Sequence, residues 1–464
     1  MTHDHIAALR AEVRGPVLLP GEDGWDDERS GFNTAVRHRP DAVVGARGAD
    51  DVRAAVAFAR ARGLPVAVLG TGHGPSVAAD HGVLITTRRM TALSVDPVTR
   101  TARLGAGVRM ERVAAEAAPH GLAPLGGSAP FAGAVGYLLG GGLPVLGRTY
   151  GWGADRIRAI DVVTPDATAR HITAESDPDL FWALRGARDN FGVVTGVECE
   201  LIPLARLFGG GLFFDGGDPA RARELLTAWQ RWTETVPEEM NTSVAMVRLP
   251  DAPGLPEPVR GRYVVHIRIA TPLEAAEGER LVAPLRALGP RLIDTLADLP
   301  WTRAGSIHGD PPTPMAWNGD TALLDGLAEA EAGAIVELGG PGAPVPSIVE
   351  IRLMGGALSR PGPVPSAVGH RSARYILTVL SRLGNGDAQA VAAAHRALID
   401  ALAPRTTGRF LTFMGFGENA APDRVRTAYE PEDLARLARL KARFDPRDTF
   451  RLNHHIEPAT GGTG

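Results

Sequence analysis

The sequence predicts an α+β fold with two domains, and three observations support this prediction. Its 464 residues exceed what one hydrophobic core usually serves, since single cores rarely grow beyond roughly 250–300 residues. The first part of the chain alternates short apolar strands with short helices, whereas longer helices alternate with strand candidates after about residue 205. Proline-rich links punctuate the second part, which is typical of a largely antiparallel sheet with flanking helices.

The helix and strand candidates of the first part lead to a glycine-rich loop. Residues 50–62 carry apolar side chains at helical spacing behind an aspartate, and Gly63 is expected to end this helix. A short strand, 64–69, follows directly and delivers the chain into the loop. Further candidates are the strands 82–86, 101–107, 157–164 and 191–201, and the helices 109–119 and 177–186.

The second part shows the same two patterns in longer segments. Strands are expected over 262–270, 348–354 and 373–380, and helices over 219–235, 272–288, 387–402 and 431–443.

Composition and charge limit the classes of protein to which this chain can belong. Apolar residues make up 44% and charged residues 22% of the chain, as in globular proteins that are soluble. The formal net charge of −4 does not indicate the excess of basic residues that binding to nucleic acid or to an anionic membrane requires. No apolar stretch approaches the length of a membrane span and no export signal opens the chain, so the expected location is the cytoplasm. The single cysteine, Cys199, excludes an internal disulfide and is expected to be a buried small apolar residue.

Two glycine-rich loops point to a cofactor. The first follows strand 64–69 and reads Leu69-Gly70-Thr71-Gly72-His73-Gly74-Pro75-Ser76; the second extends from Gly126 to Gly142. Glycines let a backbone approach a bulky group closely, and an imidazole is a nucleophile. Together the loops predict a pyrophosphate-bearing cofactor held by backbone groups, with His73 placed to bond to it. The alternative is a structural histidine that merely follows a strand.

Several segments, in the same order along the chain, resemble the vanillyl-alcohol-oxidase-type flavoproteins, and in particular their berberine-bridge-enzyme-like branch. The segments are Gly70-Thr71-Gly72-His73-Gly74, residues 133–142, Arg148-Thr149-Tyr150-Gly151, residues 179–186, Asn190-Phe191-Gly192-Val193-Val194-Thr195, residues 441–446 and residues 450–456.

This resemblance implies where each domain lies and how FAD is held. A PCMH-type FAD-binding domain of two subdomains would cover 1–205, a substrate domain 206–420, and a last segment, 421–464, would return to the FAD domain. His73 would carry the flavin through its 8α-methyl group, while Gly192 and Val194 would face the adenine side. The other cofactor-binding residues implied are Leu69, Gly70, Thr71, Gly72, Gly74, Pro75, Ser76, Gly127, Ser128, Gly133, Val135, Gly136, Gly140, Gly141, Gly142 and Asn453.

The chain departs from the family pattern beside the flavin. Many members bind FAD a second time through a cysteine, but Ala129 stands at that position, so attachment through His73 only is implied. Tyr137 replaces a histidine that supports the flavin in many plant members. Its phenol could donate the same hydrogen bond, or its ring could simply pack.

The catalytic base also departs from the pattern. The late-strand segment 410–415 has Phe413 near the expected tyrosine, and the strand that follows His370-Arg371 has no carboxylate. In the strand 348–354, alternation places Glu350 and Arg352 together on one face. Partial burial there would raise the pKa of Glu350 and let it accept a substrate proton. The alternative is a Glu350–Arg352 pair that satisfies the sheet face.

The resemblance implies an FAD-linked oxidoreductase that oxidises a small organic compound, a secondary metabolite, with dioxygen as electron acceptor. Glu350, Tyr137 and Arg352 are its candidate catalytic residues. One alternative is an oxygenase of the Favorskiiase type, working through a flavin-N5-oxide on a polyketide that could be bound to a carrier protein. The other is a flavin-binding cyclase or binding module without redox turnover. No metal is expected, because His454-His455 lacks a third ligand at suitable spacing.

Overall fold

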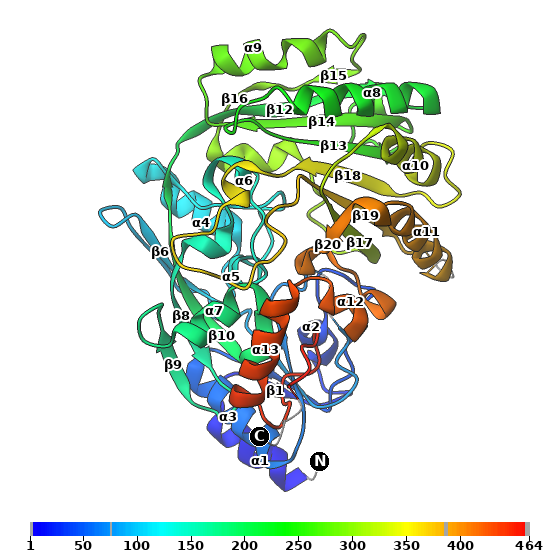
Figure 1. Cartoon of the computed structure of the whole chain (residues 1–464). Helices are drawn as coiled ribbons and strands as arrows, with labels where there is room; N and C mark the ends of the chain where they lie inside the picture. The colour runs from blue at the N-terminus through cyan, green and yellow to red at the C-terminus, as the bar shows by residue number, and fades with distance from the viewer. Residues whose placement is uncertain (1–2, 75–76, 385–387, 460–464) are drawn as a thin grey trace.

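The structure is a computed structural model that describes residues 3–74, 77–384 and 388–459. Figure 1 shows two bodies stacked along the long axis of the molecule, with both chain ends in the lower body and residues from the middle of the sequence in the upper one. Antiparallel pairing predominates in the sheets of both bodies, and among the described strands only three, in the lower body, pair in parallel. The structure therefore confirms an α+β fold with two domains.

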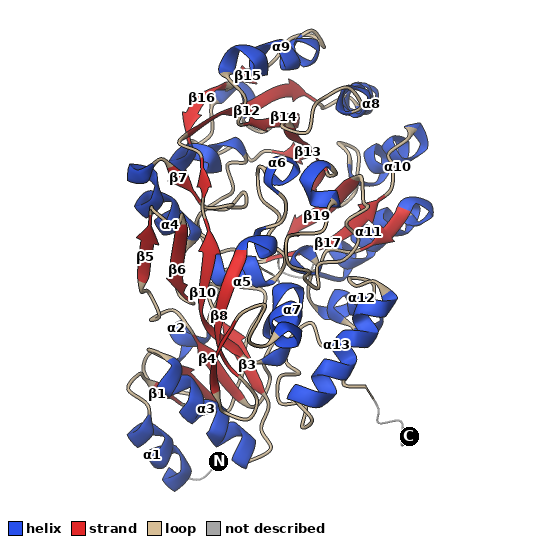
Figure 2. Ribbon diagram, turned by 60° about the vertical axis from the view of Figure 1, so that its left-hand side comes forward, coloured by secondary structure: helices blue, strands red, loops and turns tan. Residues whose placement is uncertain are grey.

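Two sheets form the framework of the lower body (Figure 2). The strands are β1 Val17–Leu18, β2 Ala42–Gly45, β3 Val66–Leu69, β4 Val83–Thr86, β5 Leu93–Asp96, β6 Thr101–Gly105, β8 Ile157–Val163, β9 Ala169–Ile172 and β10 Val193–Glu200; β7 Leu122–Ala123 pairs with β11 Ile202–Pro203. One sheet has the order β1-β2-β4-β3, with β2, β4 and β3 parallel. The other is antiparallel, with the order β5-β6-β10-β8-β9.

Three helices of this body, α3, α4 and α7, lie close to where the sequence predicts them, and the other four were not predicted. They are α1 His3–Glu12, α2 Trp25–Arg29, α3 Ala49–Ala61, α4 Met110–Ala117, α5 Ala134–Leu139, α6 Gly147–Tyr150 and α7 Pro178–Ala187. Helix α3 is followed by Gly63 in a left-handed conformation (φ 63°), as expected. Helix α7 begins after Asp177, whose carboxylate accepts a hydrogen bond from Leu180 N at 3.2 Å.

A nine-stranded sheet forms the upper body. Its strands are β12 Arg206–Asp215, β13 Asn241–Arg248, β14 Tyr263–Thr271, β15 Ile293–Asp294, β16 Ala297–Pro300, β17 Trp317–Leu324, β18 Ile348–Leu353, β19 Tyr375–Arg382 and β20 Thr406–Gly408. They follow the order β15-β12-β14-β13-β18-β19-β17-β20, with β16 also paired to β12, and all these pairings are antiparallel. This confirms the antiparallel sheet predicted for the second domain.

Four helices cover one face of that sheet: α8 Pro219–Thr233, α9 Ala275–Arg286, α10 Glu329–Gly339 and α11 Ala388–Ala401. Alternate residues of the strands, such as Val349 and Ile351 of β18, pack against these helices in one apolar core. The residues between them, including Glu350 and Arg352, therefore lie on the opposite face of the sheet, which the helices do not cover.

The C-terminal part of the chain returns to the lower body. Helices α12 Pro422–Arg426 and α13 Pro431–Phe444 follow β20, and α13 lies beside α7 (Figure 2). Lys441, the only lysine in the sequence, is fully buried at the end of α13. Its ammonium donates to Asn190 O at 2.8 Å, Phe450 O at 2.9 Å and Asp445 Oδ2 at 2.8 Å. These bonds attach the last segment to the loop between α7 and β10.

The late strand expected at 410–415 is wrong. Residues Leu411–Phe413 form a single 3₁₀ turn, with Phe413 N donating to Phe410 O at 2.9 Å. Thr412 Oγ1 donates to Gly140 O at 2.7 Å, so this segment contacts the second glycine-rich loop instead of extending the sheet.

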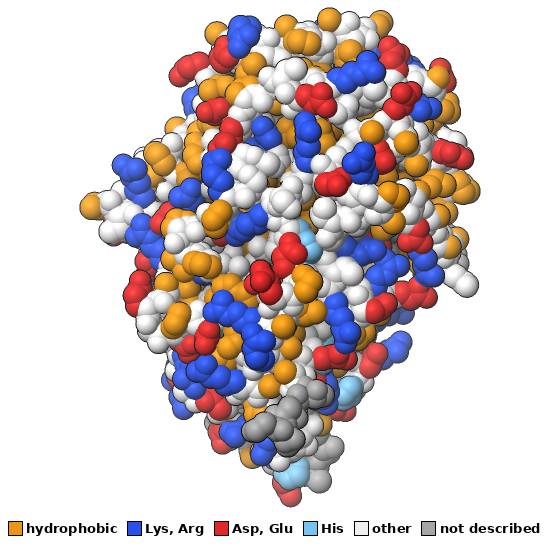
Figure 3. Space-filling view, viewed as in Figure 1, with side chains coloured by type: hydrophobic (Ala, Val, Ile, Leu, Met, Phe, Trp, Pro, Cys, Tyr) orange, Lys and Arg blue, Asp and Glu red, His pale blue; other side chains and the backbone are white. Residues whose placement is uncertain are grey.

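No helix within the described ranges is both long and apolar enough to cross a membrane. On the face drawn in Figure 3, basic and acidic side chains are interspersed.

Candidate functional site

A cavity of about 110 Å³ lies in the lower body, between the two sheets, α5 and the C-terminal segment. Its lining includes six residues that were predicted to bind a cofactor: Gly70, Val135, Gly136, Gly192, Val194 and Asn453. Sequence reasoning missed the other lining residues, which are His38, Ala67, Val68, Val77, Thr87, Ala106, Leu139, Arg188, Asp189, Leu452 and His454. The cavity thus brings together segments as far apart in the sequence as His38 and His454.

The glycines of this cavity serve two different purposes. A Cβ at Gly136 would meet nothing within 4 Å, and one at Gly70 only Thr87 Oγ1 at 3.7 Å, so these positions leave space in the cavity. Gly192 has φ 145°, and a Cβ there would lie 2.4 Å from Val163 O. Only glycine can therefore make this turn into β10.

The His73 loop is fixed to its neighbours through backbone bonds. Thr71 O accepts from Phe32 N at 3.0 Å, and Thr71 Oγ1 accepts from Gly133 N at 3.2 Å, which joins the two glycine-rich loops. Gly72 has φ 61°, and a Cβ there would lie 2.6 Å from Gly31 Cα. The structure thus explains why the loop needs glycine immediately before His73.

The His73 ring is packed between two aromatic rings. The centroid of the His73 ring lies 4.4 Å from that of Phe32 and 5.1 Å from that of Phe131. Burial lowers the pKa of His73, with Asp310 acting in the opposite direction and Arg109 in the same one. Its Nδ1 atom is buried without a hydrogen-bond partner. A neutral imidazole with a free ring nitrogen has the protonation state required of a nucleophile.

Tyr137 of α5 is enclosed by glycines. A Cβ at Gly127 would lie 2.9 Å from its ring, and one at Gly142, where φ is 64°, would lie 3.0 Å away. Burial raises the pKa of Tyr137 far above its usual value, although Arg352 acts to lower it. The ring is packed, and its hydroxyl is buried without a partner. The phenol therefore stays protonated and retains a hydrogen bond to donate.

The remaining predicted cofactor residues occupy the same loops. Leu69 packs in a small apolar cluster, Gly140 O accepts from Thr412, Gly141 has φ 104°, and Gly74 and Ser128 are half-buried. Pro75 and Ser76 lie outside the described residues.

Three buried polar atoms without partners test whether a flavin fits these residues. They are His73 Nδ1, Tyr137 Oη and Asn453 Oδ1, from the first loop, from α5 and from the C-terminal segment. Buried polar atoms in folded proteins are nearly always hydrogen-bonded, so such atoms mark places where a bound group completes the set. Asn453 lines the cavity, whereas His73 and Tyr137 do not but lie on the same segments as the lining residues Gly70 and Gly136. The arrangement therefore fits a cofactor with many polar groups that extends beyond the cavity.

Glu350 lies in a cluster of charged groups on the uncovered face of the large sheet. Its Oε1 accepts from Arg268 Nη1 at 2.5 Å and from Ser243 Oγ at 3.0 Å. Its Oε2 accepts from Arg352 Nε at 2.9 Å, with Arg352 Nη2 at 2.8 Å. The Glu350–Arg352 pair foreseen as an alternative does form, and a second arginine on β14 joins it.

The predicted rise in the pKa of Glu350 is wrong. Burial alone raises this pKa, but Arg352 and Arg268, followed by His308, outweigh burial and hold the pKa well below its usual range. This outcome could not be predicted from the sequence, because Arg268 lies 82 residues away and is brought beside Glu350 only by the order β14-β13-β18.

Two histidines complete this cluster. His266 stacks on Phe213 at 3.8 Å and accepts from Arg268 Nε at 3.2 Å, and burial lowers its pKa well below 6.5. The His308 side chain is 6% exposed, and its Nε2 lies 3.5 Å from Glu350 Oε1. Alternation in the predicted strand 262–270 was a signal for His266 and Arg268, since both lie on one face. No sequence pattern indicated His308.

The two remaining predictions about reactive residues concern Cys199 and the pair His454-His455. Cys199 is buried with Val197 and Leu201, as expected, and burial raises its pKa to about 12. His454 Nε2 lies 3.1 Å from Gly415 O, and His455 Nε2 lies 2.9 Å from Asp448 Oδ1. Across the described ranges, no cluster of three metal-ligand side chains occurs.

Comparisons with known proteins agree with this site. A family model for an FAD binding domain matches residues 40–173, and one described as berberine and berberine like matches residues 412–457. The two matches cover the glycine-rich loops and the C-terminal segment that border the cavity.

Relatives match the chain over nearly its whole length. (R)-6-hydroxynicotine oxidase from Paenarthrobacter nicotinovorans is 28% identical over 97% of this chain and 98% of its own. The crystal structure of 6-hydroxy-D-nicotine oxidase from Arthrobacter nicotinovorans superimposes with a TM-score of 0.83 at 25% identity, over 96% and 98% of the two chains. Glucooligosaccharide oxidase from Acremonium strictum, described with a 6-S-cysteinyl, 8α-N1-histidyl FAD, shares the fold with a TM-score of 0.85 at 20% identity, over 98% and 100%.

Proposed function

Because the chain belongs to the berberine-bridge-enzyme-like, PCMH-type family of FAD-linked oxidoreductases, we propose that it is an oxidase whose FAD is attached covalently through His73 alone. It binds FAD and is an enzyme of the FAD-linked oxidase and oxygenase class. Beyond FAD binding and enzyme class, we propose covalent attachment of the flavin through His73, a small organic substrate from secondary metabolism, and dioxygen as electron acceptor.

The buried, unpartnered Nδ1 of a neutral His73 carries the proposed attachment. This atom is a ready nucleophile for the 8α carbon of the flavin. A second bond through sulfur is unavailable, because the only cysteine, Cys199, is buried in the core of the first domain and Ala129 stands in the second loop. The relative from Acremonium strictum, by contrast, is described with both a cysteinyl and a histidyl bond.

The chain's own residues would hold FAD and accept the proton that the substrate loses. Gly70, Gly136 and Gly192 let the backbone approach the cofactor, and Asn453 offers a free amide oxygen. When bound, the flavin accepts the equivalent of a hydride from the substrate and returns the electrons to dioxygen. Glu350, which its arginine neighbours keep ionised, would accept the substrate proton at a carboxylate oxygen. Tyr137 would donate a hydrogen bond from its buried hydroxyl.

Acid precipitation of the purified protein tests the attachment. We expect a yellow pellet with no flavin in the supernatant, and a digest in which a single peptide, the one with His73, carries the flavin mass. The variant His73→Ala should release its flavin into the supernatant. His120→Ala, which changes an exposed histidine, is the matched control and should behave as the wild type. Free FAD from the wild-type protein would contradict covalent attachment, and failure to bind any FAD would contradict the function as a whole.

The fate of dioxygen distinguishes an oxidase from the oxygenase alternative. An oxidase releases about one hydrogen peroxide per product and leaves no label from ¹⁸O₂ in that product. Incorporation of ¹⁸O into the product would instead establish the oxygenase.

A further inference from the structure

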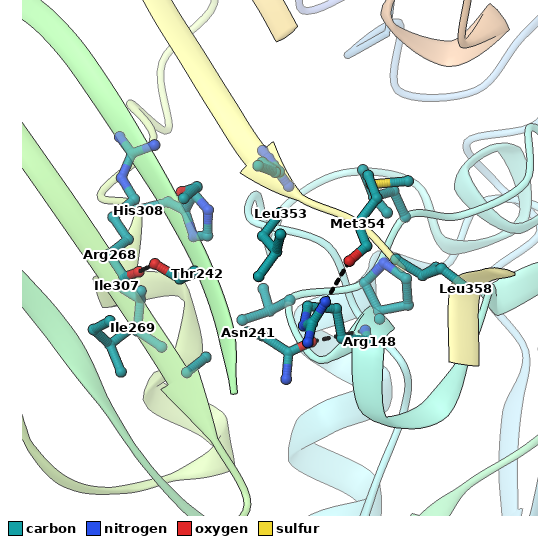
Figure 4. Close-up of a pocket in the computed structure, with 17 residues that line it drawn as sticks. Arg148, Asn241, Thr242, Arg268, Ile269, Ile307, His308, Leu353, Met354 and Leu358 are labelled. Carbon is teal, nitrogen blue, oxygen red and sulfur yellow. Dashed lines mark hydrogen bonds between the residues drawn. The ribbon is translucent and has the colours of Figure 1, made fainter. Parts of the chain in front are cut away.

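A second cavity, of about 30 Å³, lies between the uncovered face of the large sheet and the segment 143–148 of the first domain. Figure 4 shows Arg268 and His308 entering from one side and Arg148 from the other. A single water needs roughly 10–15 Å³, so the space suits a group of two or three heavy atoms. Three arginines and one histidine line it, and no aspartate or glutamate does.

Positive charge around this cavity exceeds negative charge. Glu350, behind the lining, is shared by Arg268 and Arg352. The guanidinium of Arg148 donates to main-chain carbonyls, those of Met240 at 2.8 Å, Met354 at 2.5 Å and Pro237 at 3.2 Å. Two further carboxylates, Glu238 and Glu239, act on Arg148 without bonding to its guanidinium, and Glu238 is paired with Arg360 at the surface. Three guanidinium groups therefore face one carboxylate at a site where little water screens them.

His308 adds an independent sign of a ligand. Its side chain is 6% exposed, it lines the cavity, its Nδ1 is buried without a hydrogen-bond partner, and its Nε2 has only a long contact of 3.5 Å to Glu350 Oε1. A buried polar group left in this state is costly, so a bound group that pairs with it is favoured. Burial lowers the pKa of His308, with Glu350 acting in the opposite direction, so near neutral pH the ring offers one donor and one acceptor.

We propose that this cavity binds a carboxylate of the substrate, so that the enzyme acts on an organic acid. The proposal rests on the proposed function, since it names the class of substrate for the same site. The carboxylate would accept hydrogen bonds from Arg268, Arg352 and His308 and would offset the excess positive charge. An ammonium group would meet three arginines there, and a neutral amide would lack the ionic attraction.

Three probes of one shape test this inference on the holoenzyme: 3-phenylpropionate, 3-phenylpropionamide and 3-phenylpropylammonium. Binding is measured by isothermal titration calorimetry at constant ionic strength, so no turnover is required. The carboxylate should bind at least about tenfold more tightly than the amide, since a charge-assisted pair is stronger than a neutral one. The ammonium should show no saturable binding. Equal affinity for carboxylate and amide, or preference for the ammonium, would overturn the inference.

Arginine variants locate the binding. Arg268→Gln and Arg352→Gln should each weaken carboxylate binding about tenfold or more and change amide binding by less than about twofold. Arg262→Gln, which removes an exposed arginine just before β14 that pairs with Asp215, is the matched control and should leave both affinities unchanged. An equal loss in the control would overturn the assigned site. If a variant does not fold, the comparison of three probes on the wild type still decides.

These outcomes are separable from those of the proposed function. A yellow protein with covalent flavin that prefers the ammonium contradicts only the organic-acid inference. Free FAD in the supernatant, or ¹⁸O in the product, contradicts only the proposed covalent oxidase, because calorimetry on the flavin-loaded protein reads probe binding directly.

Discussion

Replacement of Glu350 by glutamine is expected to lower kcat by about 10²–10⁴-fold, which is the usual contribution of a general base. The variant keeps an oxygen that can accept from Ser243 and Arg268, but it cannot take a proton. Steady-state oxidation under air, compared with reduction of the flavin without oxygen, would show whether the loss lies in the step that removes the substrate proton.

Two controls separate a role in proton transfer from a structural one. Glu277→Gln changes an exposed glutamate of α9 and should retain full activity. The flavin content and melting temperature of Glu350→Gln report whether the two arginines still pack normally without their carboxylate. A kcat within about threefold of wild type, in a folded and flavin-loaded variant, would rule out Glu350 as the base.

The assignment of Glu350 as the base also predicts the direction in which activity changes with pH. A base works only when ionised, so activity is present above its folded pKa and is lost as pH falls through that value. Because the arginines hold the pKa of Glu350 well below 4.5, kcat/KM should remain flat from neutral pH down to at least pH 4.5. Arg352→Gln removes the largest lowering influence and should move the acid limb to higher pH. A wild-type acid limb near pH 6 would contradict this.

Much of the fold followed from local patterns. The helices α3, α8, α11 and α13 could be predicted within two residues, because apolar spacing and caps are properties of short segments. Strand β12 could not, since Gly209, Gly210 and Gly211 suggest a loop. The structure explains all three glycines. A Cβ at Gly211 would lie 2.0 Å from the ring of His266, one at Gly209 would lie 2.8 Å from Ile307, and one at Gly210, where φ is 141°, would lie 2.4 Å from Thr295 O.

The candidate site shows the same difference between features set by local sequence and features set by tertiary contacts. His73 and the glycines around it could be recognised because they are contiguous and their backbone demands are local. The charge on Glu350 could not be predicted, because it depends on Arg268 from two strands away in the sheet and on His308 from a 3₁₀ segment. The partly buried carboxylate was foreseen, but the direction of its pKa was not, since tertiary neighbours decide between burial and charge.

Replacement of Lys441 by methionine is expected to destabilise the first domain by about 3–5 kcal/mol, as when one partner of a buried ion pair is removed. The chain has one lysine against 48 arginines, so an ammonium is retained only where its three donors meet three acceptors on Asn190, Asp445 and Phe450. Melting followed by circular dichroism should show a drop of roughly 5–15 °C. Flavin content should fall too, because the segment that includes Asn453 loses its attachment.

Three companion variants identify the cause of this loss. Lys441→Arg keeps the charge, but a planar guanidinium does not fit an ammonium site, so it should also destabilise. The double variant Lys441→Met with Asp445→Asn should be more stable than Lys441→Met alone, because no unpaired charge remains buried and the single amide oxygen of Asn can still accept from one of the Thr449 and Phe450 amides. Arg439→Met, on the exposed side of α13, should change stability by less than about 0.5 kcal/mol. If Lys441→Arg were as stable as wild type, charge alone would explain the site, and the fit of the ammonium would not be the reason that this lysine is present.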